Sequence, residues 1–416
     1  MSVIDSFEHH HPIWLRRDNA RHELAGLPRM ARLGLNLIMS LKYGSLTVRL
    51  PNGKSYLIRG EQAGPDADLT IHDFRFAKMV VQSGDVGVGE AYTAGYWSSP
   101  DVTTFLELFC VNREATLEAL KGRPIMRFLL SLRHWLNANT KRGSKRNISA
   151  HYDLGNQFYR EWLDETMTYS SALYQEGAQS LEAAQHAKYA ALVKDTDIQP
   201  HHSVLEIGCG WGGFAEFVGK EVGAKVKALT ISREQYDFAC QRIHKAGLNE
   251  KIEICFQDYR DETGRYDRIA SIEMFEAVGE RYWPTYFEKL ASCLKPKGRA
   301  GLQIVTIQDS MFEDYRRGTD FIQRHIFPGG MLPPPGKLND MGRQQGLSLS
   351  AERIFGQDYA RTLADWRERF HEAWPRIRPL GFDDRFKRLW EFYFHYCEAG
   401  FRSGNIDVRQ LVYAKS

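Results

Sequence analysis

The spacing of hydrophobic positions changes near residue 150. Before that point, Ser45–Arg59 alternates apolar and polar residues on both sides of Pro51-Asn52-Gly53, a pattern that predicts a β-hairpin. The neighbouring segments predict one further strand and four helices: Asp68–His72, Phe74–Gln82, Gly89–Thr93, Val102–Val111 and Leu120–Asn137. We therefore expect an α+β domain over residues 1–137, with an additional helix at its N-terminal end.

After residue 150, short apolar runs alternate with helical periodicity. Helices such as Gln235–Ala246 and Tyr282–Leu294 separate the runs, which predicts a doubly wound, mostly parallel α/β sheet in residues 151–416. Seven segments are strand candidates: Ser203–Ile207, Lys225–Ile231, Ile252–Gln257, Tyr266–Ile272, Arg299–Thr306, Leu347–Ile354 and Val408–Ala414. Between the fifth and sixth lies Asp309–Gln345, whose length is typical of a lid or a binding loop.

Composition narrows the class of protein. The 416 residues are 43% hydrophobic and 26% charged with a net charge of +3, as in a soluble globular protein. No apolar run reaches about 18 residues, and the start of the chain does not resemble a secretory signal, so we expect a cytoplasmic protein. The six cysteines are scattered without a C-x-x-C pair, which favours reduced thiols over zinc ligands or disulfides.

Two segments combine basic residues with different neighbours. Pro28–Lys42 is rich in apolar residues, so it fits either a helix at an anionic membrane interface or a helix facing the core. Asn139–Asn147 is compact, basic and polar. Because short charged segments are usually solvated, we interpret residues 138–150 as a linker between the two domains.

A glycine-rich turn follows the first strand of the predicted sheet. Val204–Gly213 places Gly208, Gly210 and Gly212 between the strand and a helical segment. Such a turn lets backbone N–H groups approach a ligand, and the helix start behind it favours polar or negative groups. Glycine spacing alone occurs in several nucleotide-binding folds, so the ligand stays open at this point.

Polar residues also follow the other strands. In an open parallel sheet, ligands bind beyond the carboxyl ends of the strands, so these residues are expected at one edge. Any single one, such as Ser232 or Asp258, is as well explained as a helix N-cap, but the whole set indicates a binding site. The set comprises Thr230, Ser232, Gln235, Asp258, Tyr259, Ser271, Glu273, Glu276, Gln303, Val305 and Thr306.

Nine stretches of the second domain carry a resemblance to a known family. They are His151–Asn156, Met167–Ser170, Leu181–Gln185, Val204–Gly213, Leu229–Gln235, Gln257–Asp261, Met274–Glu276, Ile326–Pro333 and Ala399–Arg402. On these stretches the chain resembles the cyclopropane-fatty-acid synthases, including the mycolic-acid cyclopropane synthases, which are S-adenosyl-L-methionine-dependent methyltransferases. Gly87–Trp97 is similar to full-length members that act on phospholipids, so the resemblance covers about residues 40–415.

The resemblance implies a class I methyltransferase domain with S-adenosyl-L-methionine as its cofactor. The glycines of the turn would line the methionine and ribose. The other cofactor contacts implied are Thr230 and Gln235 at the ribose, Asp258 and Tyr259 at the adenine, and Tyr152, Tyr169 and Ser170 closing over the cofactor. Tight positioning and exclusion of water would favour methyl transfer.

The resemblance also implies the acceptor, the cis double bond of an acyl chain on a membrane phospholipid. Methylation of an alkene leaves a carbocation, which aromatic faces and a carboxylate stabilise. In the family, a bicarbonate ion held by cysteine, glutamate, histidine, tyrosine and backbone groups then removes a proton. By the same resemblance we expect a lipid-presenting N-terminal domain, peripheral association with the inner face of the membrane and a homodimer, with no nucleic-acid partner.

The expected anion pocket differs here from the family pattern. Glu276 and Tyr359 are present, but Ser171 replaces the cysteine and Gln303 the histidine, and Ala277 replaces a second histidine. Serine and glutamine can still bind an anion, although the titratable imidazole is lost. We assign Ser171, Glu276, Gln303 and Tyr359 to catalysis. Glu276 is expected to be essential for handling the cation. The product is then a cyclopropane, or a methylene- or methyl-branched chain; a non-catalytic lipid-binding relative is the other alternative.

Three features have weaker interpretations. His9–His11 can bind a metal but is better explained as a polar terminus, and we expect no metal site. The aromatic segment Trp390–Tyr396 fits an acyl tunnel and a packed core face equally well. With the Asp309–Gln345 insertion, helices near Leu363–Trp374 and Arg385–Phe401 would cap the acyl site.

Overall fold

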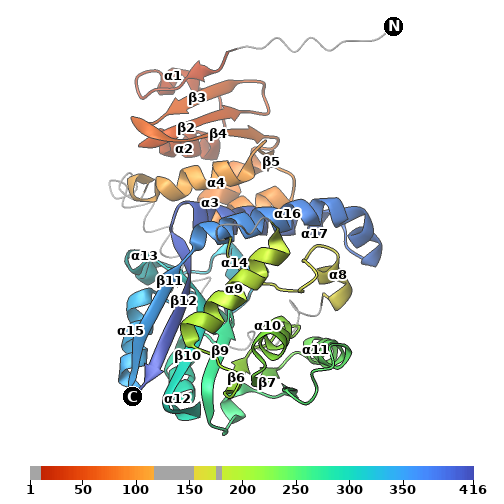
Figure 1. Ribbon diagram of the computed structural model, residues 1–416. Coiled ribbons are helices and arrows are strands. Elements are labelled where there is room, and N and C mark those ends of the chain that lie inside the picture. The colour runs from red at the N-terminus through yellow and green to blue at the C-terminus, as the bar shows by residue number, and fades with distance from the viewer. Residues whose placement is uncertain (1–10, 117–153, 175–179) are drawn as a thin grey trace. The chain divides into compact units, whose positions relative to one another are not determined.

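The computed structural model describes residues 11–116, 154–174 and 180–416, which form two compact units (Figure 1). The first unit contains the described part of Met1–Asn137 together with Asp383–Ser403, and the second contains the described part of Ala138–Phe382 together with Gly404–Ser416. The predicted helix Leu120–Asn137, the linker 138–150, His9, His10 and Tyr152 lie outside the described residues.

The first unit is built on a five-stranded sheet. The predicted hairpin is confirmed, because Ser45 pairs with Arg59 in an antiparallel ladder closed by a turn at Pro51 and Asn52. In sheet order the strands are β1 (Ile13–Trp14), β3 (Ser55–Arg59), β2 (Tyr43–Arg49), β4 (Gln62–Ile71) and β5 (Trp97–Ser98). The helices are α1 (Ala20–Glu23), α2 (Arg29–Ile38), α3 (Arg75–Thr93), α4 (Val102–Val111) and α17 (Asp384–Arg402).

Helix α17 belongs to the first unit, whereas we expected it in the second domain as part of an acyl-site cap. The Thr103 hydroxyl of α4 lies 2.7 Å from Nδ1 of His395 and donates to Glu398 (3.0 Å), which satisfies two buried polar groups of α17. The ring centroids of Phe392 and Tyr92 lie 5.7 Å apart. In the structure, the aromatic segment Trp390–Tyr396 therefore contributes to the core of the first unit.

The second unit contains the predicted doubly wound sheet, which confirms the expected fold class. Strand β12 runs antiparallel to both of its neighbours, β10 and the edge strand β11, and β10, β9, β6, β7 and β8 pair in parallel. In sheet order the strands are β11 (Leu347–Ile354), β12 (Ile406–Lys415), β10 (Leu294–Ile307), β9 (Tyr266–Ile272), β6 (Ser203–Ile207), β7 (Lys225–Thr230) and β8 (Ile252–Phe256).

Helices cover both faces of this sheet (Figure 1). Alternate residues of one strand point to opposite faces, so Leu205 joins one core cluster and Val204 the other. The Leu205 cluster packs against α12 and α15, and the Val204 cluster packs against α9, α10 and α11. The helices are α8 (Asn156–Arg160), α9 (Leu181–Thr196), α10 (Gly213–Phe217), α11 (Arg233–Lys245), α12 (Trp283–Cys293), α13 (Asp309–Tyr315), α14 (Phe321–His325), α15 (Pro335–Gln344) and α16 (Gly356–Ile377).

The Asp309–Gln345 insertion is largely helical rather than a long loop. It folds into α13, α14 and α15, and Leu338 of α15 is completely buried in the core. Helix α15 is therefore one of the layers that cover the sheet. No helix in the described ranges is long and apolar enough to cross a bilayer.

Candidate active site

The glycine-rich turn adopts a conformation that favours glycine. Gly208, Gly210 and Gly212 have φ values of 82°, 53° and 82°, in the left-handed region. A Cβ on Gly208 would lie only 2.7 Å from Cγ of Met274, whereas a Cβ on Gly210 would meet no protein atom within 4 Å. The turn is thus packed at Gly208 and open at Gly210, where a ligand has room to approach.

The open part of the turn also offers hydrogen-bond donors. The N–H groups of Gly208 and Cys209 donate to the carbonyl of Leu229. Those of Gly210 and Trp211 donate to no group among the described residues. These two N–H groups and the empty space beside Gly210 fit a polar ligand such as the carboxylate and ribose of a nucleoside-containing cofactor.

The predicted cofactor residues after β7 and β8 lie at the same edge of the sheet. The Thr230 hydroxyl donates to Oε1 of Gln235 (3.0 Å), which orients this amide at the end of β7. Asp258 forms an ion pair with Arg260 (2.6 Å), so a ligand would share this carboxylate with the guanidinium. Tyr259 stacks edge-on with Tyr286, 5.4 Å between ring centroids.

Two apolar side chains beside these residues had no predicted role. Ile231 directly follows the largely buried strand β7 and is 61% exposed, and Phe256 ends the edge strand β8 and is 53% exposed. Large apolar residues left exposed at strand ends are suited to cover a flat ring such as adenine. The signal in the sequence was their position at the ends of the strand candidates Lys225–Ile231 and Ile252–Gln257.

Glu273 lies at the centre of the predicted anion pocket. Its Oε1 accepts hydrogen bonds from the backbone N–H of Ser171 and from Nε2 of Gln303, both at 2.8 Å. Its Oε2 accepts one from the hydroxyl of Tyr359 at 2.6 Å. Three of the four residues assigned to catalysis therefore converge on Glu273, a residue that the sequence placed at the strand end but gave no role.

The fourth assigned residue, Glu276, has different contacts. It lies in a short 3-10 turn (Phe275–Ala277), and its Oε1 accepts a hydrogen bond from the N–H of Val305. Its buried Oε2 has no hydrogen-bond partner among the described residues. Burial, and after it the charge of Glu273, raises the pKa of Glu276 to about 8, so this carboxyl is protonated at neutral pH.

A buried lysine supports the segment that carries Ser171. Nζ of Lys188, on α9, donates to the hydroxyl of Ser170 (2.7 Å), and Gln185 donates to the Ser170 carbonyl (2.9 Å). Lys188 is completely buried. Burial lowers its pKa to about 7, while the charge of Glu273 acts in the opposite direction.

Lys188 has no predicted role, but the sequence contained a signal for it. Leu181, Ala184, Lys188 and Leu192 recur at helical spacing on the buried face of α9, so a charged residue interrupts an apolar stripe. Gln410 of β12 connects the same elements, since it donates to the Lys188 carbonyl (3.2 Å) and to Oε1 of Gln303 (3.1 Å).

Aromatic rings surround Tyr169, one of the predicted cofactor residues. Its ring centroid lies 5.2 Å from Trp366, 5.6 Å from Trp162 and 5.4 Å from Tyr159. Trp366 is also 6.0 Å from Tyr359, the donor to Glu273. The carboxylate of Glu273 is thus connected through Tyr359 to a cluster of aromatic rings.

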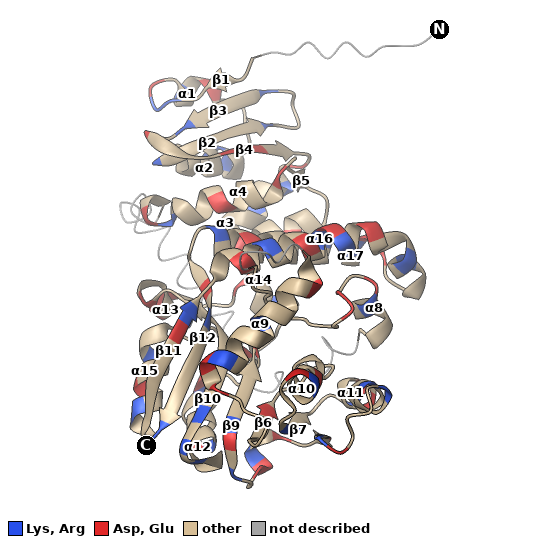
Figure 2. Cartoon of the chain, viewed as in Figure 1, with Lys and Arg blue, Asp and Glu red and all other residues tan. Residues whose placement is uncertain are grey.

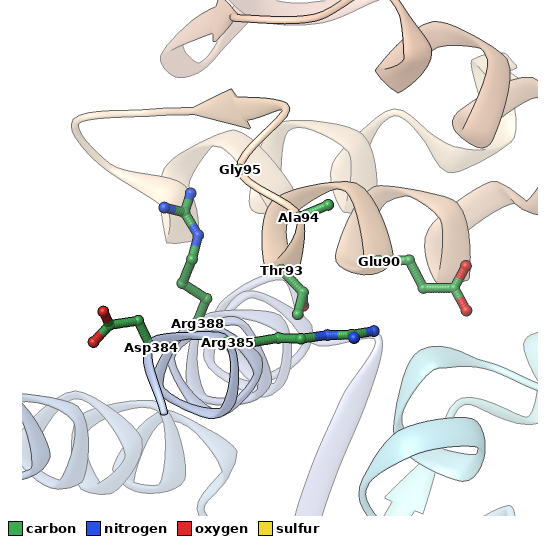
Figure 3. Close-up of a pocket in the computed structure, with 7 residues that line it drawn as sticks. All are labelled: Glu90, Thr93, Ala94, Gly95, Asp384, Arg385 and Arg388. Carbon is green, nitrogen blue, oxygen red and sulfur yellow. The ribbon is translucent and has the colours of Figure 1, made fainter. Parts of the chain in front are cut away.

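The first unit contains a separate cavity of about 480 Å³ between the end of α3 and the first turn of α17 (Figure 3). Arg388 donates from Nε to the Tyr92 carbonyl (2.9 Å) and its guanidinium lies 4.9 Å from the centroid of the Tyr92 ring, which leaves its two Nη atoms without a hydrogen-bond partner among the described residues. Arg385 has no hydrogen bond or ion pair with any described residue. The cavity is lined by Glu90, Thr93, Ala94, Gly95, Asp384, Arg385 and Arg388.

Metal ligands are not grouped in the part of the chain that the structure describes. No set of three or more His, Cys, Asp or Glu residues there is arranged to hold a metal ion.

The parallel sheet with one antiparallel strand, together with the glycine turn after its first strand, defines an S-adenosyl-L-methionine-dependent methyltransferase of class I. Residues 139–411 match the family model described as mycolic acid cyclopropane synthetase. The chain belongs to this cyclopropane synthase family, which confirms the resemblance in its sequence and the expected cofactor.

Individual relatives differ in the activities that their names state. The chain is 37% identical to tuberculostearic acid methyltransferase UfaA1 of Mycobacterium tuberculosis, with 80% of each chain covered. It is 33% identical to the cyclopropane-fatty-acyl-phospholipid synthase of Escherichia coli K12, over 84% of this chain and 88% of the relative. Among solved structures, cyclopropane synthase MmaA2 from M. tuberculosis is 28% identical with a TM-score of 0.61, covering 67% of this chain and all of that one.

Proposed function

We propose that the protein transfers the methyl group of S-adenosyl-L-methionine to a carbon of the double bond in an unsaturated fatty acyl chain. The observation that carries the proposal is the Glu273 carboxylate, connected through Tyr359 to the aromatic cluster around Tyr169. Methylation of an alkene leaves a carbocation, and both a carboxylate and aromatic faces stabilise positive charge. Methyl transfer to nitrogen or oxygen leaves no such cation.

The residues present at the turn fit S-adenosyl-L-methionine. This cofactor, when bound, supplies a methyl group on a positively charged sulfur. The N–H groups of Gly210 and Trp211 would hold its polar end, and the exposed faces of Ile231 and Phe256 would cover its adenine. The predicted contacts of Thr230, Gln235, Asp258, Tyr259, Tyr169 and Ser170 stay part of this proposal.

Two products follow from the same cation. If the added methyl group loses a proton directly, its C–H electron pair closes a cyclopropane ring. If a hydride first moves from the methylated carbon to the cationic carbon, the same proton loss gives a methylene branch. The second product is favoured by the similarity to a relative named a tuberculostearic acid methyltransferase and by Gln303 in place of histidine.

We propose that the acyl chain belongs to a phospholipid. The relative from E. coli is named a fatty-acyl-phospholipid synthase. In the first unit, Arg385 and the Nη atoms of Arg388 offer guanidinium donors at a cavity, and such donors suit a phosphate group. Glu90 and Asp384 bring negative charge to the same cavity, which disfavours a polyanion such as nucleic acid.

The first unit also has a surface suited to peripheral binding at the inner, cytoplasmic face of a membrane. Ile13 and Trp14 of β1 are 38% and 50% exposed, and the Arg16 guanidinium lies 3.4 Å from the centroid of the Trp14 ring. Residues 11–61 contain nine Lys or Arg and three Asp or Glu (Figure 2). Apolar side chains with basic neighbours are typical of proteins that bind anionic lipid surfaces.

The reaction is tested by incubating the purified full chain with S-adenosyl-L-methionine and vesicles of a mono-unsaturated phospholipid. We expect the acyl chain to gain the mass of one methylene unit, and vesicles of a saturated phospholipid to remain unchanged. Because both products have the same mass, NMR of the isolated lipid distinguishes a ring from a methylene branch. A chain that binds lipid without producing any mass gain would be a non-catalytic relative.

Membrane binding is tested separately by sedimentation with vesicles. We expect the protein to bind vesicles that contain anionic lipid, and a Trp14→Ala variant to bind at least tenfold more weakly while it still binds S-adenosyl-L-methionine. Equal binding by the variant would exclude this surface. The homodimer implied by the resemblance stays a prediction, which analytical ultracentrifugation checks.

A further inference from the structure

We infer that Glu273 is the base that removes the proton from the methylated intermediate, so that the chain carries its own carboxylate where the family uses a separate anion. The inference rests on the proposed function, because only an alkene acceptor leaves a cation that must lose a carbon-bound proton. It assigns to Glu273 a role that the sequence assigned to a bound bicarbonate ion.

The hydrogen bonds of Glu273 leave one position for a proton. Each carboxylate oxygen has two lone pairs. Both lone pairs of Oε1 accept hydrogen bonds, one from Ser171 N–H and one from Nε2 of Gln303. One lone pair of Oε2 accepts the hydrogen bond from Tyr359, and the other accepts none from any described residue. These three donors favour the ionised form of the carboxylate against the effect of burial, which raises its pKa, and they fix it in place, as a general base requires.

The same donors are no longer available to a separate anion. Ser171, Gln303 and Tyr359 are the residues expected to bind bicarbonate, and each of them has a hydrogen bond to Glu273. A second anion beside the Glu273 carboxylate would also meet like-charge repulsion. The contacts therefore favour an internal carboxylate over a bound ion.

Glu273 is held in a strained backbone conformation. Its φ of 48° is in the left-handed region, which for a residue with a Cβ costs about 1 kcal/mol. A hydrogen bond from Glu273 N–H to the carbonyl of Gln303 (2.8 Å) fixes this conformation directly after β9. Strained residues with polar side chains concentrate at functional sites, where the surrounding contacts maintain them.

Glu273 also lies next to the cofactor turn. The Ser271 hydroxyl donates to the carbonyl of Ile207 (2.8 Å), which ties the end of β9 to the end of β6 immediately before Gly208. Met274, the residue after Glu273, packs against Gly208. A methyl group delivered from the turn is therefore delivered beside this carboxylate.

The proposed step balances without an additional reactant. The alkene electron pair forms a bond to the methyl carbon, and the C–S bond breaks with its electrons kept by sulfur. Glu273 then accepts a proton from the new methyl group at Oε2. The C–H electron pair closes the ring or, after the hydride shift, forms the C=C bond, and the proton passes to water after the product leaves.

The test uses two variants of Glu273 and measures lipid methylation in buffer freed of carbon dioxide and in buffer with added bicarbonate. Glu273→Gln keeps the size and loses the base. Glu273→Gly removes the side chain, relieves the positive φ and opens space for an ion, so it is expected to fold. Glu288→Gln, on the exposed face of α12, is the matched control.

We expect wild-type activity to be the same in both buffers. Without bicarbonate, both Glu273 variants should lose about 100-fold or more in turnover, the range for loss of a general base. Bicarbonate should restore at least tenfold to Glu273→Gly and nothing to Glu273→Gln. Calorimetry should show unchanged affinity for S-adenosyl-L-methionine in all variants.

Two results would overturn the inference while leaving the proposed function intact. One is wild-type methylation that stops when carbon dioxide is removed and returns with bicarbonate. The other is a Glu273→Gln variant with wild-type turnover. If the wild type methylates no unsaturated lipid in either buffer, the proposed function fails and the inference fails with it.

Discussion

The hydroxyl of Tyr359 donates a 2.6 Å hydrogen bond to Oε2 of Glu273. Tyr359 lies in the first turn of α16 and Glu273 directly after β9, so the bond joins two elements that are distant in the sequence. Burial raises the pKa of Glu273, and the Tyr359 bond is the largest of the contributions that lower it. The phenol therefore helps to set the charge of the carboxylate on which the site is centred.

Removing this hydroxyl should change the pH dependence of catalysis. In Tyr359→Phe, Glu273 loses a donor to its ionised form, so its pKa rises and the acid limb of the pH–rate profile moves to higher pH. We expect turnover at neutral pH to fall about tenfold, with unchanged binding of S-adenosyl-L-methionine. Tyr266→Phe, which removes a hydroxyl bonded to Glu262 at the other end of β9, is the control. An equal shift in both variants would contradict the assignment.

The glycine turn gives a prediction that separates binding from stability. Gly210→Ala places a Cβ in the open space beside the free N–H groups, so affinity for S-adenosyl-L-methionine should fall at least tenfold. Gly346→Ala is matched, because its φ of 70° is also positive and its Cβ would also meet no atom within 4 Å. Both should lose about 1 kcal/mol of stability from the backbone. If calorimetry shows equal affinity in the two variants, the turn does not hold the cofactor.

Sequence periodicity predicted the sheet closely and the site only in part. The strands Ser203–Ile207, Tyr266–Ile272 and Leu347–Ile354 begin and end where the apolar pattern indicates, because burial on a sheet dictates that pattern. The convergence on Glu273 was not visible, since its direction depends on a positive φ and on contacts with distant elements. The periodicity of helix α17 shows that the helix is amphipathic. It does not show which of the two units the apolar face packs against.

The two carboxylates at the end of β9 should respond differently to substitution. At neutral pH, Glu276 is protonated, so Glu276→Gln replaces one neutral group by another and retains an oxygen for the N–H of Val305. We expect less than about tenfold loss of turnover, against about 100-fold for Glu273→Gln. The sequence predicted instead that Glu276 is essential. A loss in Glu276→Gln as large as in Glu273→Gln would support that earlier prediction.

The stability of the same variant should depend on pH. The pKa of Glu276 is about 8 in the folded chain against 4.5 as the ordinary value, so the folded state retains a proton that the unfolded state releases. The contribution of the Glu276 carboxyl to the free energy of unfolding is fully present below about pH 4.5 and is lost as the pH rises to about 8. Glu276→Gln should therefore gain stability relative to the wild type over this window, by about 1.4 kcal/mol per pH unit at most. Denaturation at several pH values measures the difference.

Lys188 should act on Glu273 without contacting substrate. It is a buried cation that holds Ser170, next to the Ser171 N–H that donates to Glu273, and its charge favours the ionised carboxylate. In Lys188→Met the acid limb of the pH–rate profile should move to higher pH, with turnover reduced more than the affinity for S-adenosyl-L-methionine. Lys194→Met, on the exposed side of α9, should leave the profile unchanged.

Stability provides a second and independent measurement of Lys188. Burial lowers its pKa to about 7 from 10.5, while Glu273, Asp164 and Glu206 oppose the shift. Between these two pH values the unfolded chain binds a proton that the folded chain does not, so wild-type stability relative to Lys188→Met should rise as the pH increases from about 7 to 10. A difference that stays constant over this range would mean that Lys188 keeps its ordinary pKa. The lysine would then be permanently charged in the fold, and the change in activity would arise from the loss of that charge and of its hydrogen bond to Ser170 rather than from its titration.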